Sequence, residues 1–457
     1  MIVEPRTENS SGTAEVLAPA EPDYALRFVA CDRDSTPSTP GQQDRPRRRN
    51  LDPRGAARVL VVDQNCSIPS DRRVWSEIVA LRGAGYDVVS ICPQGDGRDG
   101  EAHEHLDGVD IHRYPQPEAS GSALSYLREY ATAFWRINRL AHRVAGVRGF
   151  DIVHVCNPPD FLLIAVHFLR RRGAYAIFDH HDLAPELYLA RFGSHGGALY
   201  RLALLLERIN FRLADLVLAT NESYKRVAVE RGRKRPDDVV VVRSGPELAR
   251  FEPVPADPAL KRGRPHLISY IGEMAPQDGL DHALRALAHL REDRDDWQAV
   301  FAGDGGALDS LQQLVVELGL SDHVEFAGWL QDRELRSLLC SSDVCLVPDP
   351  KTRLSDASTL VKIAEYMAMS RPIVAYDLTE SRVTAGEAAL YAHPNDPTDF
   401  ARAISVLLDD PVRRAQMGRV GRERVVAGLS WEHGQQALLA AYSTALSRRE
   451  ASGRSSS

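Results

Sequence analysis

The chain has 457 residues, with 56 lysines and arginines against 63 aspartates and glutamates, and a formal net charge of −7. This length predicts two or three domains, and the acidic balance argues against a dedicated nucleic-acid-binding protein. No apolar run reaches the roughly 18 residues that a membrane-spanning helix needs, and the acidic N-terminus lacks the apolar core of a secretory signal.

Residues 1–57 are rich in Ser, Thr, Pro, Asp and Arg and have no periodic apolar pattern. Such a segment buries too little apolar surface to fold, so it is predicted to be a disordered leader. The basic run within it, residues 45–50, is expected either to be solvated or to touch an anionic membrane surface weakly. Residues 448–457 are expected to form a flexible tail.

The six cysteines have no CxxC pair and no metal-ligand spacing. Four of them, Cys66, Cys92, Cys156 and Cys345, lie in or beside apolar runs. They are interpreted as buried thiols in a reducing compartment rather than as disulfides.

The first ordered domain is predicted at residues 58–250. Its valine-rich runs are typical of strands buried on both faces of a parallel sheet, and helix-length segments such as residues 71–84 lie between them. The predicted strands are residues 58–63, 87–92, 149–156, 175–179, 215–220 and 238–243.

The same pattern restarts after a proline-rich linker at residues 251–264. The second domain is predicted at residues 265–428, with strands at residues 266–271, 297–302, 323–326, 343–348, 372–376 and 389–391. Alternating strands and helices predict an α/β fold of two doubly wound domains. The functional site is expected in the cleft between them, lined by loops that follow strands.

One such loop carries two histidines flanked by aspartates, in the run Asp179-His-His-Asp182. Histidine titrates near neutral pH, and a neighbouring carboxylate can fix its tautomer. Adjacent strand residues point to opposite faces, so one histidine is expected to face the cleft while the other packs. The alternative is a purely structural pair.

Three further loops carry candidate chemistry. Residues 301–306 form a glycine-rich turn that would let backbone approach a ligand. Residues 355–358 (Ser-Asp-Ala-Ser) are expected to cap a following helix, on which Lys362 and Glu365 share one face and are both partly buried. Arg72 and Arg73 follow the first strand and could reach a phosphate. The two DxD sequences, at residues 32–34 and 293–295, are interpreted as solvated charge rather than as metal motifs.

Taken in order, these loops resemble the nucleotide-sugar glycosyltransferases of the GT-B fold, and most closely the retaining glycosyltransferase family four (group 1). The resemblance covers roughly residues 58–445. The stretches that carry it are Pro69-Ser-Asp-Arg-Arg-Val-Trp75, Phe178-Asp-His-His-Asp182, Gly272-Glu-Met-Ala-Pro-Gln-Asp-Gly279, Ala302-Gly-Asp-Gly305, Lys362-Ile-Ala-Glu-Tyr-Met-Ala368 and Leu429-Ser-Trp-Glu432.

The resemblance implies two Rossmann-like domains: residues 58–250 would hold the acceptor and residues 265–428 the nucleotide sugar, with residues 429–447 forming a helix that crosses back to the first domain. His181, Asp182 and Glu365 would be the catalytic residues, with Glu365 on the donor's ribose. Arg72, Arg73 and Glu186 would serve the phosphate or acceptor side. The donor-binding set would comprise Gly272, Met274, Gly303, Gly305, Trp329, Leu330, Asp356, Ser358, Thr359, Leu360, Lys362 and Glu365.

Two departures from the family pattern stand out. The first glutamate of the family's paired glutamates would fall at Ala357, and Asp356 is the nearest carboxylate. The family's arginine and lysine for the diphosphate are replaced by the acidic Glu273 and Asp278. Either Lys362 and an arginine such as Arg73 replace this clamp, or the donor is bound weakly.

The resemblance implies a retaining, metal-independent hexosyltransferase that needs no cofactor. It would move a sugar from a UDP- or GDP-sugar to a glycan or lipid-linked acceptor in cell-surface polysaccharide synthesis, in the cytoplasm. The alternatives are a sugar-nucleotide epimerase on the same fold and a degenerate scaffold protein. Residues 122–148 are amphipathic and basic, so they are expected either to pack as an ordinary helix or to contact the inner face of the membrane. No oligomeric state is predicted.

Overall fold

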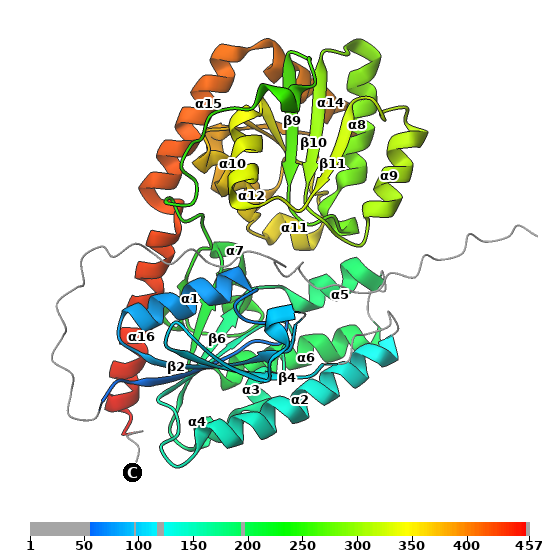
Figure 1. The fold of residues 1–457 in the computed structure, drawn as a ribbon. Helices are drawn as coiled ribbons and strands as arrows, with labels where there is room; N and C mark the ends of the chain where they lie inside the picture. Colours follow the sequence, from blue (N-terminus) through cyan, green and yellow to red (C-terminus); the bar gives the residue numbers. More distant parts are fainter. Residues whose placement is uncertain (1–54, 96, 117–122, 193–196, 454–457) are drawn as a thin grey trace, which may run out of the picture.

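A computed structural model describes residues 55–95, 97–116, 123–192 and 197–453. Residues 1–54 of the expected leader and the last four residues of the expected tail therefore lie outside the described part of the chain. Two α/β domains stack on each other, with the N-terminal domain in the lower half of Figure 1. Within the described residues, no helix is both long and apolar enough to cross a bilayer.

The N-terminal domain is built on a sheet in the order β3-β4-β2-β1-β5-β6-β7-β8, in which only β3 runs antiparallel to its neighbour. The strands are β1 (Arg58–Val62), β2 (Asp87–Pro93), β3 (His103–Leu106), β4 (Val109–Tyr114), β5 (Ile152–Cys156), β6 (Tyr175–His180), β7 (Leu216–Ala219) and β8 (Val239–Val241).

Helices cover both faces of this sheet. One face packs against α1 and the C-terminal helix α16, and the other packs against α2, α3, α4, α6 and α7, which forms two separate apolar clusters. Helix α5 contacts α6 and α11 (Arg353–Ala357). The helices are α1 (Arg72–Gly83), α2 (Ala123–Ala145), α3 (Leu162–Ala165), α4 (His167–Arg171), α5 (Ala184–Phe192), α6 (Ala198–Leu213) and α7 (Glu222–Glu230).

The C-terminal domain has a parallel sheet in the order β11-β10-β9-β12-β13-β14. The order in which strands are added changes side between β9 and β12: β10 and β11 lie on one side, and β13 and β14 lie on the other. Ligands of such sheets bind at this switch point. The strands are β9 (His266–Ile271), β10 (Trp297–Ala302), β11 (Val324–Gly328), β12 (Val344–Val347), β13 (Ile373–Tyr376) and β14 (Ala389–Ala392).

The helices of this domain also lie on both faces of its sheet. Apolar side chains of α8, α9 and α14 pack on one face, and those of α10 and α12 on the other. The helices are α8 (Leu280–Asp293), α9 (Leu308–Glu317), α10 (Asp332–Ser341), α11 (Arg353–Ala357), α12 (Val361–Ala368), α13 (Thr379–Ala385), α14 (Pro397–Asp409) and α15 (Pro411–Arg424). The expected α/β fold of two doubly wound domains is confirmed.

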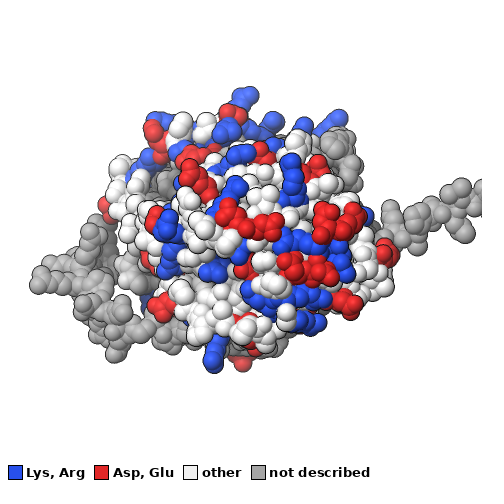
Figure 2. All heavy atoms as spheres, turned by 90° about the horizontal axis from the view of Figure 1, so that it is seen from above, with Lys and Arg blue, Asp and Glu red and all other residues white. Residues whose placement is uncertain are grey.

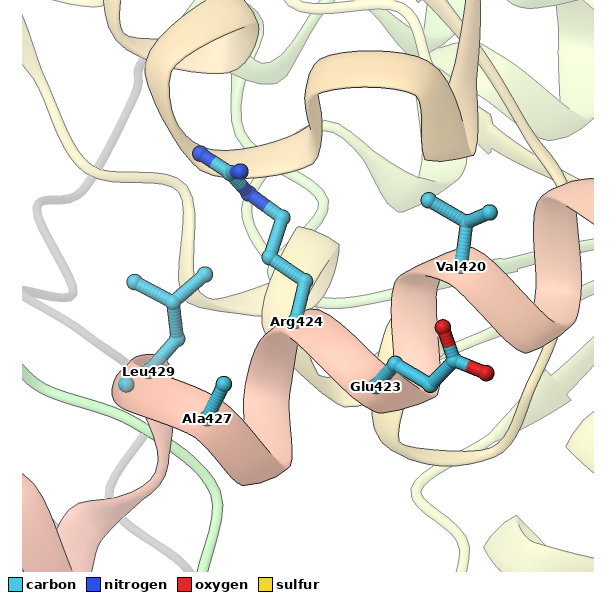
Figure 3. A pocket seen from close by; sticks show the side chains of 6 residues that line it. Val420, Glu423, Arg424, Ala427 and Leu429 are labelled. Carbon is cyan, nitrogen blue, oxygen red and sulfur yellow. The ribbon is translucent and has the colours of Figure 1, made fainter.

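The chain then returns to the first domain. A π-helical turn at Val425–Leu429 connects α15 to α16 (Trp431–Ala451), and α16 lies on α1, β6 and β8. A pocket of about 520 Å³ lies along α15 and this turn (Figure 3). In it, Arg424 already donates to the backbone oxygens of Val383 and Thr384. We do not assign function to this pocket, because its arginine is used in joining α15 to α13.

Two expectations are wrong. Cys66 is disulfide-bonded, whereas Cys92, Cys156, Cys340 and Cys345 are free thiols. Sequence spacing does not reveal which residues meet in space, so scattered cysteines gave no sign of this bond. The antiparallel pair β3 and β4 was also missed, because its histidines and acidic residues hide the alternation.

Candidate active site between the two domains

Loops that follow strand ends in both domains meet at one interface. Asn221, just after β7, donates from Nδ2 to Ala357 O and Thr359 Oγ1, both at 2.8 Å. Tyr224 Oη lies 3.1 Å from Ser358 Oγ. The carboxyl-end loops of the two sheets are therefore in direct contact.

The paired histidines at the end of β6 have different surroundings. His180 is fully buried, 5.1 Å from the ring of Phe211 and 5.3 Å from that of Tyr224. Burial lowers the pKa of His180 to about 3, so its ring is neutral. The side chain of His181 is 14% exposed, and its Nε2 lies 2.6 Å from Asp179 Oδ2. His181 is thus the histidine that a ligand could reach.

Asp179 lies at the centre of a buried charged cluster. Besides His181, its carboxylate contacts Arg73 at 3.2 Å and His154 Nε2 at 3.4 Å. Although burial raises it, the charges of His181 and Arg73 hold the pKa of Asp179 well below its usual range. Asp179 is therefore ionised and fixes one ring nitrogen of His181.

Arg73 and His154 connect this cluster to the rest of the domain. Arg73 also contacts Glu77 at 3.1 Å and donates to Ser244 Oγ. His154 Nδ1 lies 2.7 Å from the hydroxyl of Tyr442 on α16. The expected phosphate role does not fit Arg73, since its guanidinium is 15% exposed and bonded within its own domain. The sequence could not show this, because two of its partners, Asp179 and Ser244, are distant along the chain.

Two groups of three side chains in this cluster bring possible metal-ligand atoms close together. One group is His154, Cys156 and Asp179, and the other is Glu77, Asp179 and His181. The Arg73 guanidinium already bonds to Asp179 and Glu77, so both carboxylates have a positively charged partner. Burial, with the charge of Asp179, raises the pKa of Glu77 well above its usual range, which favours a protonated Glu77. Arg73 therefore supplies positive charge at these carboxylates.

The other predicted residues of this domain differ in role. Glu186 pairs with Arg231, which also contacts the buried Glu207. Glu186 is thus used in holding α5 to its neighbours. Asp182 lies at the site, and its backbone N and O bond to the side chain of Asn157. Burial raises the pKa of the Asp182 carboxyl.

Two glycine loops of the C-terminal domain touch each other. A Cβ atom on Gly303 would lie 1.8 Å from Gly272 O, and one on Gly305 would lie 2.5 Å from Met274 O. Gly272 and Gly303 have φ of +141° and +140°, values that glycine alone adopts easily. The side chain of Met274 is fully buried, so only its backbone borders the site.

Lys362, on α12, lies beside Gly272 but does not pair with Glu365. Its Nζ lies 3.1 Å from Asp349, 3.5 Å from Asp278 and 4.7 Å from the centre of the Tyr270 ring. Although burial lowers it, Asp349 raises the pKa of Lys362 well above its usual value. Burial raises the pKa of Asp278 to about 6. Where the family pattern has an arginine and a lysine for the diphosphate, this chain therefore has a lysine whose charge is already neutralised by Asp278 and Asp349.

Glu365 is one turn further along α12 and is only partly buried. No side-chain hydrogen bond or ion pair joins its carboxylate to any other described residue. Burial raises the pKa of Glu365, and the charges of Arg72 and Arg250 oppose this effect. The site therefore contains an unpartnered carboxylate facing two arginines.

Arg72 crosses from the N-terminal domain to this group. Its guanidinium lies 4.0 Å from Asp332 and 5.8 Å from the ring centre of Trp329. Trp329 follows β11, is 43% exposed, and offers a flat apolar surface, while Leu330 is partly buried beside it. Arg72 and Trp329 thus border one space from opposite domains.

The residues before α12 are arranged differently from the prediction. Thr352 caps α11 through Ser355, and α12 begins after Leu360 with no side-chain cap. Asp356 instead accepts bonds from Thr379 N and Oγ1. Ser358 and Thr359 face the N-terminal domain through Tyr224 and Asn221, respectively.

Sequence reasoning missed two residues of this site, Asn221 in the N-terminal domain and Asp349 in the C-terminal domain, and it named Asp179 only as a carboxylate that flanks the histidines. Asn221 and Asp349 each lie two positions after the last residue of an apolar strand, and Asp179 lies near the end of one. A polar residue at the carboxyl end of a strand could have indicated these positions, because the carboxyl ends of parallel strands lie at one edge of the sheet, where ligands bind.

Comparison with known proteins shows the family to which the chain belongs. The family described as "Glycosyl transferase 4-like domain" matches residues 70–245, and "Glycosyl transferases group 1" matches residues 265–410. The MMP alpha-(1->4)-mannosyltransferase of Mycolicibacterium hassiacum is 28% identical over 82% of this chain and 94% of its own length. The 2-deoxystreptamine glucosyltransferase of Streptomyces kanamyceticus is 28% identical over 52% of this chain and 62% of its own length.

Among solved structures, HepE of Anabaena in complex with UDP-glucose superposes with a TM-score of 0.62 at 16% identity, covering 85% of this chain and 99% of that chain. This likeness shows the fold. The alignment with the glucosyltransferase spans about three fifths of that relative, so its substrates are not transferred to this chain.

Proposed function

Because this chain belongs to the group 1 glycosyltransferases of the GT-B fold, we propose that it transfers a hexose from a UDP- or GDP-sugar bound at the interface of its two domains. The observation that carries the proposal is the unpartnered Glu365 carboxylate, which faces Arg72 across the interface. A partly buried carboxylate without a partner loses part of its hydration, and vicinal ribose hydroxyls would donate hydrogen bonds to it. HepE, which shares the fold, binds UDP-glucose.

In this proposal the donor lies against the C-terminal domain. Trp329 would stack on the base, Glu365 would accept from the ribose, and the diphosphate would lie over the touching loops of Gly272 and Gly303. Glycine at both positions lets backbone approach the phosphates closely. The charge of Lys362, shared with Asp278 and Asp349, gives the diphosphate less attraction than a free lysine.

Transfer breaks the bond between the anomeric carbon and the diphosphate and forms a bond to an acceptor hydroxyl, whose proton leaves with the diphosphate. His181, oriented by Asp179, lies where the N-terminal domain would meet the transferred sugar. Preorganised groups at the departing charge stabilise such a transition state without a metal, and domain contact excludes water. We expect retention of the anomeric configuration.

The acceptor would lie on the N-terminal domain. A glycan or lipid-linked acceptor in cell-surface polysaccharide synthesis, with a cytoplasmic enzyme at the inner face of the membrane, remains our proposal. The two family matches give no support to the epimerase alternative. A degenerate scaffold protein would show no transfer in the experiment below.

The test is to incubate the protein with UDP- and GDP-hexoses, without added metal, and to measure nucleotide release and donor binding by calorimetry. We expect binding of one donor, and at least a tenfold loss, roughly, in Glu365→Gln, because one charged hydrogen bond is lost. Glu317→Gln, on the exposed side of α9, is the matched control. Binding of no nucleotide sugar would overturn the proposal.

A further inference from the structure

Four helices cover one face of the N-terminal sheet and expose no carboxylate. They are α2, α3, α4 and α6, which pack together through a shared apolar cluster (Figure 1). Among their described side chains, the only acidic ones are Glu129 and Glu207, and both are buried. The exposed charged groups are arginines: Arg128, Arg139 and Arg143 on α2, Arg171 on α4, and Arg201, Arg208 and Arg212 on α6.

The same outward surface exposes large apolar side chains. On α2, Phe134 is 37% exposed and Trp135 is 59% exposed. On α6, Leu199, Leu202 and Leu205 are 42%, 42% and 52% exposed. Arg139 lies over the Trp135 ring, with 5.3 Å between its Cζ and the ring centre. We call this combined surface of α2, α3, α4 and α6 the arginine-apolar face.

The rest of the molecule contrasts with this face. The whole chain has more acidic than basic residues. The face seen in Figure 2 mixes both signs. Helix α7, next in order on the same side of the sheet, exposes Glu222 and Glu230 together with Arg226. Both of these surfaces therefore expose carboxylates, which the described side chains of the arginine-apolar face do not.

We propose that the arginine-apolar face docks on an anionic phospholipid bilayer. Each basic residue near such a surface contributes attraction, and tryptophan, phenylalanine and leucine enter the boundary between headgroups and acyl chains. Exposed leucines beside the arginines do not suit a nucleic acid, which is bound through phosphates and stacked bases. Helices on one side of a sheet present their outer surfaces in the same direction, so α2 and α6 can reach one plane together.

The interior of the molecule supports the same orientation. The charged cluster of Asp179 and the interdomain loops lie at the carboxyl ends of the strands, whereas the arginine-apolar face lies on the flank of the sheet. A bilayer on this flank leaves the domain interface open to a soluble donor. Docking is thus independent of whether the proposed transfer reaction is correct.

The experiment is sedimentation of the full chain with vesicles of phosphatidylcholine alone or mixed with phosphatidylglycerol, at low and high salt. We expect binding to the mixed vesicles only, weakened by salt. Arg139→Glu with Arg143→Glu should weaken binding about tenfold or more. Leu202→Ser with Leu205→Ser should also weaken vesicle binding, and should abolish the binding that the wild type retains at high salt.

Val316→Ser with Val412→Ser is the matched control, because both valines are exposed on the C-terminal domain, at 70% and 76%. Melting temperatures of all variants check folding. Equal vesicle binding by the wild type and both face variants would overturn the proposal and would point to another part of the chain. A dimer in light scattering that the face variants abolish, without vesicle binding, would assign the face to a second copy instead.

Discussion

Asp179 is the residue whose charge holds the N-terminal side of the site together. Changing Asp179→Asn keeps the shape but removes the charge that His181 and Arg73 share. We expect kcat to fall by about tenfold or more, because His181 loses its fixed orientation, while donor binding measured by calorimetry stays unchanged. Asp237→Asn, at a side chain that is 79% exposed, is the control. Equal losses in donor affinity and kcat would contradict a positioning role for Asp179.

Asp278 gives the site a pH dependence. Its pKa is raised by burial to about 6, so below that pH it gains a proton and stops neutralising Lys362. We therefore expect donor KM to decrease as pH falls through about 6. Asp278→Asn should show the low KM at every pH, since it is never charged.

The control for this pH effect is Asp322→Asn, at an exposed carboxylate remote from Lys362. It should keep the wild-type pH profile of donor KM. A donor KM that rises on acidification in the wild type, or an unchanged profile in Asp278→Asn, would show that Asp278 does not control the charge available to the donor.

At the scale of single residues, the sequence offered His181 and Glu365 as candidates but did not show their surroundings. Both lie in runs with a distinctive composition, and the structure leaves both accessible at the interface. Arg73 has an equally distinctive place, yet its partner Asp179 is 106 positions away. Which charges are neutralised depends on such long-range contacts, and local sequence does not contain them.

At the scale of elements, the contact between the loops after β9 and β10 is the most restrictive feature. A methyl group at Gly303 would lie 1.8 Å from Gly272 O, and φ at Gly303 is +140°. We expect Gly303→Ala to destabilise the protein by about 1–3 kcal/mol and to abolish donor binding, because the two loops must separate.

Gly306 offers a control in the same turn, since a Cβ there would meet no other atom within 4 Å. Gly306→Ala should bind the donor as the wild type does. Thermal unfolding and calorimetry on both variants distinguish the cases. A Gly303→Ala protein that binds donor normally would show that this contact is not needed.

Strands in the C-terminal domain were predicted most accurately, because continuous apolar runs buried on both faces leave little ambiguity. Residues 266–271 and 297–302 match β9 and β10 in full. The start of α12 was misplaced, since three polar residues suggested a cap that α11 and the interdomain contacts use instead. Polar residues show that a turn is present, but not which helix end they serve.

At the scale of the whole molecule, the relative placement of the domains rests on few polar contacts. Beyond the bonds of Asn221 and Tyr224, Ser223 Oγ donates to Glu380 at 2.5 Å, and Trp431 N donates to Pro246 O at 3.1 Å where the two crossing segments meet. Gly245 allows that crossing, because a Cβ there would lie 2.0 Å from Leu429 O. Interfaces of this kind permit domain motion, so their bonds should govern how readily the site closes.

Asn221→Asp tests this link between closure and donor binding. Aspartate keeps the Oδ1 that accepts from Tyr224 N at the start of α7, but it loses both Nδ2 bonds to Ala357 and Thr359. Leaving Ala357 O facing a carboxylate should cost the closed form about 1–3 kcal/mol. We expect a larger radius of gyration in X-ray scattering, and donor affinity reduced about fivefold or more. Asn395→Asp, which likewise keeps its bond from Lys351 N within one domain, should change neither quantity. An Asn221→Asp protein as compact and as tight for donor as the wild type would mean that contacts other than Asn221 hold the domains together.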